Sequence, residues 1–131
     1  MKVLVTGSNG FIGKNLVSQL KNNKDISLTL SSRVSSRFSE GNINQFILTS
    51  IDSSTDWKEI LEDIDIVIHL AGIAHNNYSN FKSSIQDEYR KIKVEATLNL
   101  ANQAIKANVK RFIYLSSIKV NGEVTVKNRP F

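Results

Sequence analysis

Three glycines at every third position, Gly7, Gly10 and Gly13, restrict the fold of this chain more than any other feature. They follow the apolar run Lys2–Thr6, which is typical of a short buried strand, and a helical apolar pattern begins directly after them. Gly7 permits a sharp turn off the strand, Gly10 has no Cβ to obstruct a pyrophosphate, and Gly13 lets the helix lie close to the sheet. The helix amides and dipole would then face phosphates, so we expect a dinucleotide-binding glycine loop (Gly7–Gly13), with a purely structural turn as the alternative. The expected contacts come from Gly7, Asn9, Gly10, Phe11, Ile12 and Gly13.

Strand-like apolar runs alternate with helical patterns along the chain. We expect strands at 2–6, 26–30, 45–48, 66–70 and 111–115, and helices at 11–23, 55–64 and 84–107. The run 66–70 is continuously apolar apart from His69, as a parallel strand buried on both faces requires. This alternation predicts an α/β fold with a doubly wound parallel sheet of the Rossmann type, strand order 3-2-1-4-5. A length of 131 residues accommodates this one domain and no second one.

The composition excludes several classes of function. The sequence contains no cysteine, so it holds no disulfide, no thiolate metal site and no cysteine nucleophile, and we expect no metal. Neither a signal peptide nor a membrane helix is recognisable, and we expect a cytoplasmic protein. Lysine and arginine number 17 against 12 aspartates and glutamates, but the basic side chains are dispersed along the sequence. We interpret them as a solvated surface and expect no nucleic-acid partner.

The ligand of a doubly wound sheet lies outside the carboxyl ends of the strands, so each strand exit forms a wall of the site. An acid about 20 residues after the glycines would bind a free ribose 2′-hydroxyl. The second strand instead ends at Ser31, Ser32 and Arg33, whose hydroxyl and guanidinium groups favour a 2′-phosphate. We therefore expect Ser32 and Arg33 to bind the cofactor, NAD or NADP, with a local chemistry that favours NADP. The alternative is that Arg33 and Arg37 are ordinary loop arginines.

The third and fourth strand exits supply further candidates. Ser50 and Ile51 would wall the adenine beside Asp52, although loop solvation explains Asp52 equally well. The fourth exit offers small residues where the backbone must approach the cofactor closely. The residues expected to bind there are Leu70, Ala71 and Gly72.

The fifth exit and the two histidines complete the set of chemically interesting residues. Ser116 and Ser117 follow the fifth strand, where they either terminate it or bind the cofactor and a substrate oxygen. His69 lies within an apolar strand, and we expect a packed, hydrogen-bonded core residue rather than a catalytic one. His75 lies in a polar segment and is expected to be solvated.

The predicted helix 84–107 carries two apolar stripes. They contain Ile85, Tyr89, Ile92 and Ala96 in the first, and Val94, Leu98, Ala101 and Ile105 in the second. One stripe can pack on the sheet, and the other needs a later helix or a second subunit, unless both form a single broad buried face. We expect a homodimer formed through this helix.

The glycine loop and two further runs, Asp65–Gly72 (DIVIHLAG) and Lys110–Gly122 (KRFIYLSSIKVNG), are together similar to one family. The chain resembles the extended short-chain dehydrogenase/reductases, and more narrowly the NAD-dependent epimerase/dehydratase family, of the UDP-glucose 4-epimerase kind. The resemblance implies an NAD(P)-binding domain in which Ser117, as a catalytic residue, holds the 4-oxygen of a sugar. It also implies that a tyrosine, with a lysine four residues later, moves the proton while the nicotinamide takes the hydride.

The chain departs from the family pattern in two informative places. No Tyr-x-x-x-Lys motif follows Ser117, and the one tyrosine with a lysine at the fourth position, Tyr89, precedes the serine. Lys93 stands where the family has an asparagine among the cofactor contacts. We expect a truncated, N-terminal, cofactor-binding portion of a nucleotide-sugar epimerase, dehydratase or reductase of polysaccharide synthesis, without turnover of its own. The alternative from another class is a non-catalytic NAD(P)-sensing or scaffold domain.

Overall fold

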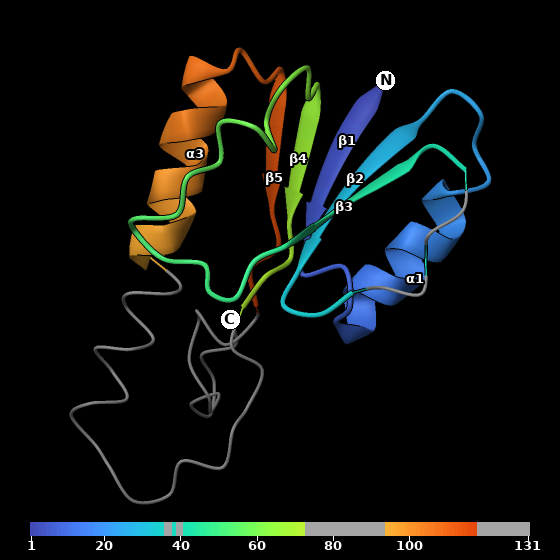
Figure 1. The fold of residues 1–131 in the computed structure, drawn as a ribbon, viewed down its shortest axis with the longest axis horizontal. Coiled ribbons are helices and arrows are strands. Elements are labelled where there is room, and N and C mark those ends of the chain that lie inside the picture. The colour runs from blue at the N-terminus through green and yellow to red at the C-terminus, as the bar shows by residue number, and fades with distance from the viewer. Residues whose placement is uncertain (36–37, 39–40, 73–93, 118–131) are drawn as a thin grey trace, which may run out of the picture.

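The computed structural model describes residues 1–35, 38, 41–72 and 94–117. They form the strands β1 (Lys2–Thr6), β2 (Ser27–Ser32), β3 (Ile43–Ile47), β4 (Ile66–His69) and β5 (Arg111–Tyr114), with the helices α1 (Phe11–Leu20) and α3 (Ala96–Lys106). All strand pairs are parallel, and the sheet order is β3-β2-β1-β4-β5 (Figure 1). The predicted doubly wound sheet with order 3-2-1-4-5 is thus confirmed. Within the described ranges, no helix combines the length and apolarity needed to cross a membrane.

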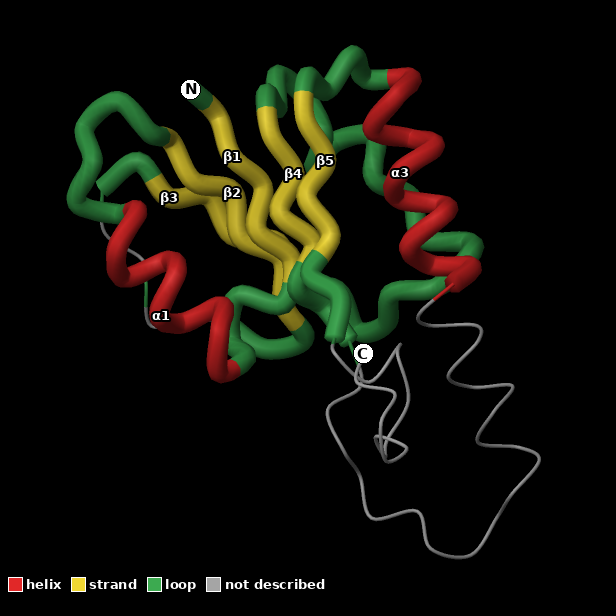
Figure 2. Tube along the Cα trace, turned by 180° about the vertical axis from the view of Figure 1, so that it is seen from behind, coloured by secondary structure: helices red, strands yellow, loops and turns green. Residues whose placement is uncertain are grey.

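The two faces of the sheet bury separate hydrophobic clusters, because successive side chains of a strand point to opposite faces. On one face, Val3 and Val5 pack with Val17 of α1. On the other face, Leu4 packs with Trp57 and with Leu100 of α3. Figures 1 and 2 show the same arrangement, with α1 and α3 on opposite sides of the sheet. Both helices begin near the carboxyl ends of the strands, the edge at which the glycine loop lies.

The segment 55–64 differs from its prediction as a short helix. Residues 58–63 form consecutive turns, and Trp57 just before them lies fully buried in the core. Side chains of α3 hydrogen-bond to backbone groups at the start of this segment. Asn99 Nδ2 and Gln103 Nε2 donate to the Thr55 carbonyl at 2.8 and 2.9 Å. Gln103 Oε1 accepts from the Trp57 amide at 2.8 Å. The Leu61 amide donates to the Trp57 carbonyl at 2.8 Å, but the bonds that follow are those of turns, so the helix prediction is wrong here.

The described part of the long predicted helix is α3, and residues 84–93 lie outside the described residues. Its inner face is formed by Ala96, Leu100 and Ala104, which are buried. Leu98 and Ile105, on the other predicted stripe, are 56% and 73% exposed. In the part of the helix that is described, a single broad buried face is therefore ruled out.

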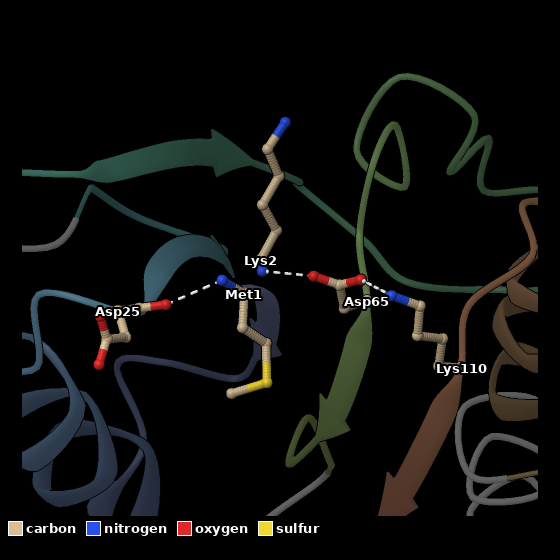
Figure 3. A network of polar contacts seen from close by, with 5 residues as sticks. All are labelled: Met1, Lys2, Asp25, Asp65 and Lys110. Carbon is tan, nitrogen blue, oxygen red and sulfur yellow. Dashed lines mark hydrogen bonds and ion pairs between the residues drawn. The ribbon is translucent and has the colours of Figure 1, made fainter.

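Asp65 joins three strands at the edge opposite the strand exits (Figure 3). Its Oδ2 accepts from the Lys2 backbone amide at 2.8 Å, and its Oδ1 pairs with Lys110 Nζ at 2.7 Å. The hydrogen bond from Lys110 and the backbone bond from Lys2 lower the pKa of Asp65. Close by, the ammonium group of Met1 donates to the Asp25 carbonyl at 2.8 Å. The carboxylate thus aligns the starts of β1, β4 and β5.

Candidate functional site

The glycine loop is held between the exits of β2 and β4. The Gly7 amide donates to the Ser31 carbonyl at 2.9 Å, and the backbone of Gly7 adopts a left-handed φ of 70°. A Cβ on Gly7 would lie 2.7 Å from the Ala71 nitrogen and 2.9 Å from the Leu70 carbonyl carbon. A Cβ on Gly13 would lie 2.3 Å from the Gly7 carbonyl oxygen. Both positions therefore require glycine for steric reasons, independently of any ligand.

The start of α1 has the properties of an anion cradle. Its N-cap is Gly10, no side chain hydrogen-bonds to the cap, and the first turn carries no acid. A Cβ on Gly10 would meet the Gly7 carbonyl oxygen at 3.2 Å, a tight contact but a much milder one than those at Gly7 and Gly13. The first residues of α1, Phe11 and Ile12, are 88% and 51% exposed. Because the dipole and cap are not neutralised by the chain, these residues fit the pyrophosphate of a dinucleotide.

The β2 exit is tied to the glycine loop by Asn9. Its Nδ2 donates to the Val34 carbonyl at 2.8 Å and to Ser32 Oγ at 3.3 Å. Ser32 Oγ in turn donates to the Val34 carbonyl at 2.6 Å. Arg33, between them, is exposed. Asn9 and Ser32 therefore shape the loop beside the cradle, and Arg33 is left at its surface.

At the β3 exit, the side chain of Asp52 forms hydrogen bonds within its own turn. The Asp52 carboxylate accepts from the Ser54 hydroxyl at 2.6 Å, from the Ser54 amide at 2.8 Å and from Ser50 Oγ at 3.1 Å. These bonds, with the Ser54 hydroxyl first, lower the pKa of Asp52. Ile51 packs against the core cluster on the α3 face. Asp52 therefore caps a turn, and the roles of Ser50 and Ile51 toward an adenine stay predictions.

The β4 exit contains a buried polar cluster around His69. The ring is 2% exposed, with Nδ1 2.7 Å from Thr6 Oγ1 and Nε2 3.0 Å from Thr97 Oγ1. Burial, which disfavours the charged imidazolium, lowers the pKa of His69 to about 4. The expectation of a packed, hydrogen-bonded core histidine is confirmed. The Ala71 amide donates to Thr6 Oγ1 at 3.2 Å, so the cluster reaches the predicted cofactor contact at Ala71.

Thr6 and Thr97 were not among the candidates from sequence. Thr6 is fully buried at the end of β1, and Thr97 lies one residue into α3. A hydroxyl residue that ends an apolar strand directly before Gly7 was the available signal for Thr6. Thr97 had no such signal, because only the packing of α3 against the sheet brings it to His69.

The β5 exit lies beside the β4 exit. The Leu115 amide donates to the His69 carbonyl at 3.3 Å, and the ring of Tyr114 stacks on the His69 ring with 5.8 Å between centroids. Ser116 and Ser117, which follow, are exposed. Lys93 and His75 lie outside the described residues. No group of three or more metal-ligating side chains occurs in the ranges that the structure describes.

Comparison with known proteins identifies the family. The sequence model of the NAD dependent epimerase/dehydratase family matches residues 3–130. The chain belongs to this family. Similar epimerase/dehydratase proteins include a UDP-glucose 4-epimerase of Vibrio cholerae, 39% identical over 129 residues, which cover 98% of this chain and 38% of that protein. A UDP-glucose 4-epimerase of Klebsiella pneumoniae is 34% identical over 138 residues, which cover 94% of each chain.

The fold of this chain is also similar to that of a solved epimerase. It is the UDP-glucuronic acid 4-epimerase from Bacillus cereus in complex with NAD, with a TM-score of 0.78 and 26% identity. The match covers 96% of this chain and 43% of that one, so this epimerase/dehydratase chain spans less than half of the solved protein. The resemblance expected from the glycine loop and the two further runs is confirmed at the level of the family.

Proposed function

We propose that residues 1–131 form the NAD(P)-binding domain of a nucleotide-sugar epimerase, with the cofactor lying across the strand exits. The observation that carries this proposal is the start of α1, where a glycine cap without a side-chain partner faces outward. The steric requirement for Gly7 and Gly13 keeps that cap beside β1 and β4. The family match and the epimerases among the similar proteins support the choice of reaction.

The proposed chemistry is a transient oxidation at carbon 4 of the sugar, for which the bound nicotinamide cofactor supplies the hydride acceptor. The glycine loop holds the pyrophosphate, and Leu70, Ala71 and Gly72 wall the cofactor at the β4 exit. Ser117 at the β5 exit holds the sugar 4-oxygen, with Ser116 and Lys93 among the cofactor contacts. We expect no turnover from these 131 residues alone, because no Tyr-x-x-x-Lys motif follows Ser117 to move the proton.

Between the two nicotinamide cofactors we propose a preference for NADP. Arg33 is exposed at the β2 exit, beside the serine hydroxyl of Ser32, and no acid occupies the exit itself. A guanidinium there would attract a 2′-phosphate, which a carboxylate would repel. The hydrogen bonds of Asn9 to the Val34 carbonyl and Ser32 hold this exit next to the pyrophosphate cradle.

Calorimetric titration of the chain with NAD and with NADP tests both parts of the proposal. Gly10→Ala should weaken both cofactors at least tenfold, because its Cβ obstructs the pyrophosphate. A melting curve without cofactor separates this loss from strain against the Gly7 carbonyl oxygen, 3.2 Å away. Arg33→Ala should weaken NADP about tenfold and leave NAD unchanged. Arg111→Ala is the matched control, an exposed arginine at the start of β5, at the opposite edge of the sheet.

The outcomes separate the two claims. Binding of neither cofactor would overturn the assignment of the cofactor domain. Equal affinity for both cofactors, unchanged by Arg33→Ala, would overturn the NADP preference and leave the domain assignment standing.

We also propose that a second copy of the chain packs on the outer face of α3. That face presents Leu98 and Ile105, and Val94 just before the helix is 46% exposed. An apolar stripe of this kind on a helix needs a partner. Light scattering at high concentration should give a dimer mass, and Ile105→Glu should give a monomer with an unchanged melting temperature. A monomeric wild-type chain would overturn the proposed dimer, and the stripe would then be left for another segment or partner to cover.

A further inference from the structure

The polar cluster at the sheet end draws one side chain from each of three elements. Thr6 of β1 and His69 of β4 are register partners, and they share the α3 face of the sheet with Leu4 and Val67 of the core below. Thr97 of α3 closes the cluster over Nε2 of the histidine. Thr6 is fully buried and His69 is nearly so, which keeps water from replacing these bonds.

The pattern of donors determines the protonation of the imidazole. The Ala71 amide can only donate, so Thr6 Oγ1 accepts there and must donate its own proton elsewhere. Within the described part of the chain, the acceptor in contact with that hydroxyl is His69 Nδ1, at 2.7 Å. Nδ1 is therefore unprotonated, and Nε2 carries the proton and donates it to Thr97 Oγ1 at 3.0 Å. The other tautomer would leave the buried proton of Thr6 without this acceptor.

The cluster also determines the distance between the glycine loop and the β4 exit. The Thr6 carbonyl accepts from the Leu70 amide at 3.2 Å, and Thr6 Oγ1 accepts from the next amide, that of Ala71. The Ala71 nitrogen lies 2.7 Å from the place of a Cβ on Gly7. The His69 carbonyl holds the Leu115 amide, two residues before Ser117. A change at the imidazole would thus reach three walls of the proposed cofactor site without direct contact with a ligand.

We propose that Thr6, His69 and Thr97 form a positioning cluster, in which the neutral Nε2–H tautomer of His69 holds the β4 exit against the glycine loop. Its effect on cofactor affinity rests on the function proposed above, whereas the tautomer does not depend on that function. Burial lowers the pKa of the ring, which agrees with a neutral imidazole at physiological pH. His69 is thereby a positioning residue and not a catalytic one.

Nitrogen NMR of the imidazole in the unliganded chain tests the tautomer. We expect a proton on Nε2 and none on Nδ1 in the wild type and in Thr6→Ser, which retains the hydroxyl. In Thr6→Val, which removes the hydroxyl and keeps the shape, the preference for Nε2–H should be lost. A wild-type ring protonated on Nδ1, or on both nitrogens at neutral pH, would overturn the cluster as described.

Calorimetry with NAD and NADP tests the positioning role. Thr6→Val should weaken the tighter of the two cofactors about fivefold to tenfold, and Thr6→Ser should restore the affinity. Thr29→Val is the matched control, because Thr29 is 7% exposed in the neighbouring strand β2 and belongs to no part of the cluster. Unchanged affinity in Thr6→Val would overturn the positioning role.

The two proposals fail in different ways. If the wild type binds neither cofactor, the proposed function fails, and the NMR result alone decides the tautomer. If Thr6→Val does not fold, Thr6→Ala replaces it, since it also removes the hydroxyl in contact with Nδ1 and should likewise abolish the preference for Nε2–H. Retention of that preference in Thr6→Ala would then count against the cluster.

Discussion

Gly13→Ala is the substitution that most directly tests how the glycine loop is packed. The new Cβ would lie 2.3 Å from the Gly7 carbonyl oxygen and 2.8 Å from the Ser8 Cα. These are backbone atoms of a loop that the Ser31 carbonyl already holds through the Gly7 amide, so no side-chain rotation relieves the contact. The oxygen would have to retreat by about 1 Å to reach an ordinary van der Waals separation. The displacement would be transmitted to the whole loop.

The magnitude follows from two opposing effects. Alanine is favoured over glycine within a helix by about 1 kcal/mol. Overpacking costs typically 1–3 kcal/mol, and we take roughly the upper end because the contacted atoms are backbone. The free energy of unfolding should therefore fall by about 2 kcal/mol, which lowers the melting temperature by about 5–10 °C in a domain of this size.

Thermal unfolding followed by circular dichroism, without cofactor, measures this change. Gly72→Ala is the matched control, because a Cβ there meets no atom of the described residues within 4 Å and its melting temperature should stay the same. A Gly13→Ala chain that melts at or above the wild-type temperature would contradict the predicted clash with the Gly7 carbonyl oxygen. Helix propensity would then outweigh the contact with the loop.

Three further predictions concern pH dependence and the core. Burial lowers the pKa of His69 from 6.5 to about 4. As the pH falls, the unfolded chain therefore binds a proton at this histidine at a higher pH than the folded chain does. The free energy of unfolding should therefore fall by up to about 3 kcal/mol between about pH 6.5 and 4, measured by urea denaturation, and His69→Gln should remove this loss. The pKa of Asp65 is lowered by Lys110, so its stabilisation is present above the ordinary value of 3.8 and is lost as the pH falls through the lowered pKa. Asp65→Asn should flatten the most acidic part of the same urea series, and an unchanged slope there would contradict this assignment. Leu100→Ala, at a fully buried position, should cost about 3 kcal/mol in urea denaturation, whereas Leu98→Ala, at 56% exposure on the same helix, should cost less than about 0.5 kcal/mol.

The segment 55–64 shows why part of the fold escaped prediction. Its apolar spacing predicted a short helix, whereas the structure forms turns that bury Trp57 completely. The spacing could not reveal that Asn99 and Gln103 would compete for the Thr55 carbonyl, because these partners lie 44 and 48 residues away in sequence. Local propensity describes a helix in isolation, and tertiary hydrogen bonds can override it.

The strand exits show the same division within the candidate site. Asp52 was a candidate beside the adenine, and the structure gives its carboxylate to Ser50 and Ser54 within its own turn. Asn9 was expected to contact the cofactor, which stays a prediction, and the structure shows that it ties the glycine loop to the β2 exit through the Val34 carbonyl. Sequence position placed both residues at the correct edge of the sheet, but it could not reveal the hydrogen bonds that each makes within the protein.

The glycine spacing and the alternation of apolar runs were sufficient to predict the doubly wound sheet, its strand order and the position of the glycine loop. They could do so because backbone sterics at Gly7 and the crossover rule for parallel strands act through local sequence. By contrast, the hydrogen-bonded cluster of Thr6, His69 and Thr97, with contacts of 2.7 and 3.0 Å, became visible only in the folded chain. The pairing of β1 with β4 and the packing of α3 over them bring these three side chains together, and no local pattern in the sequence encodes that proximity.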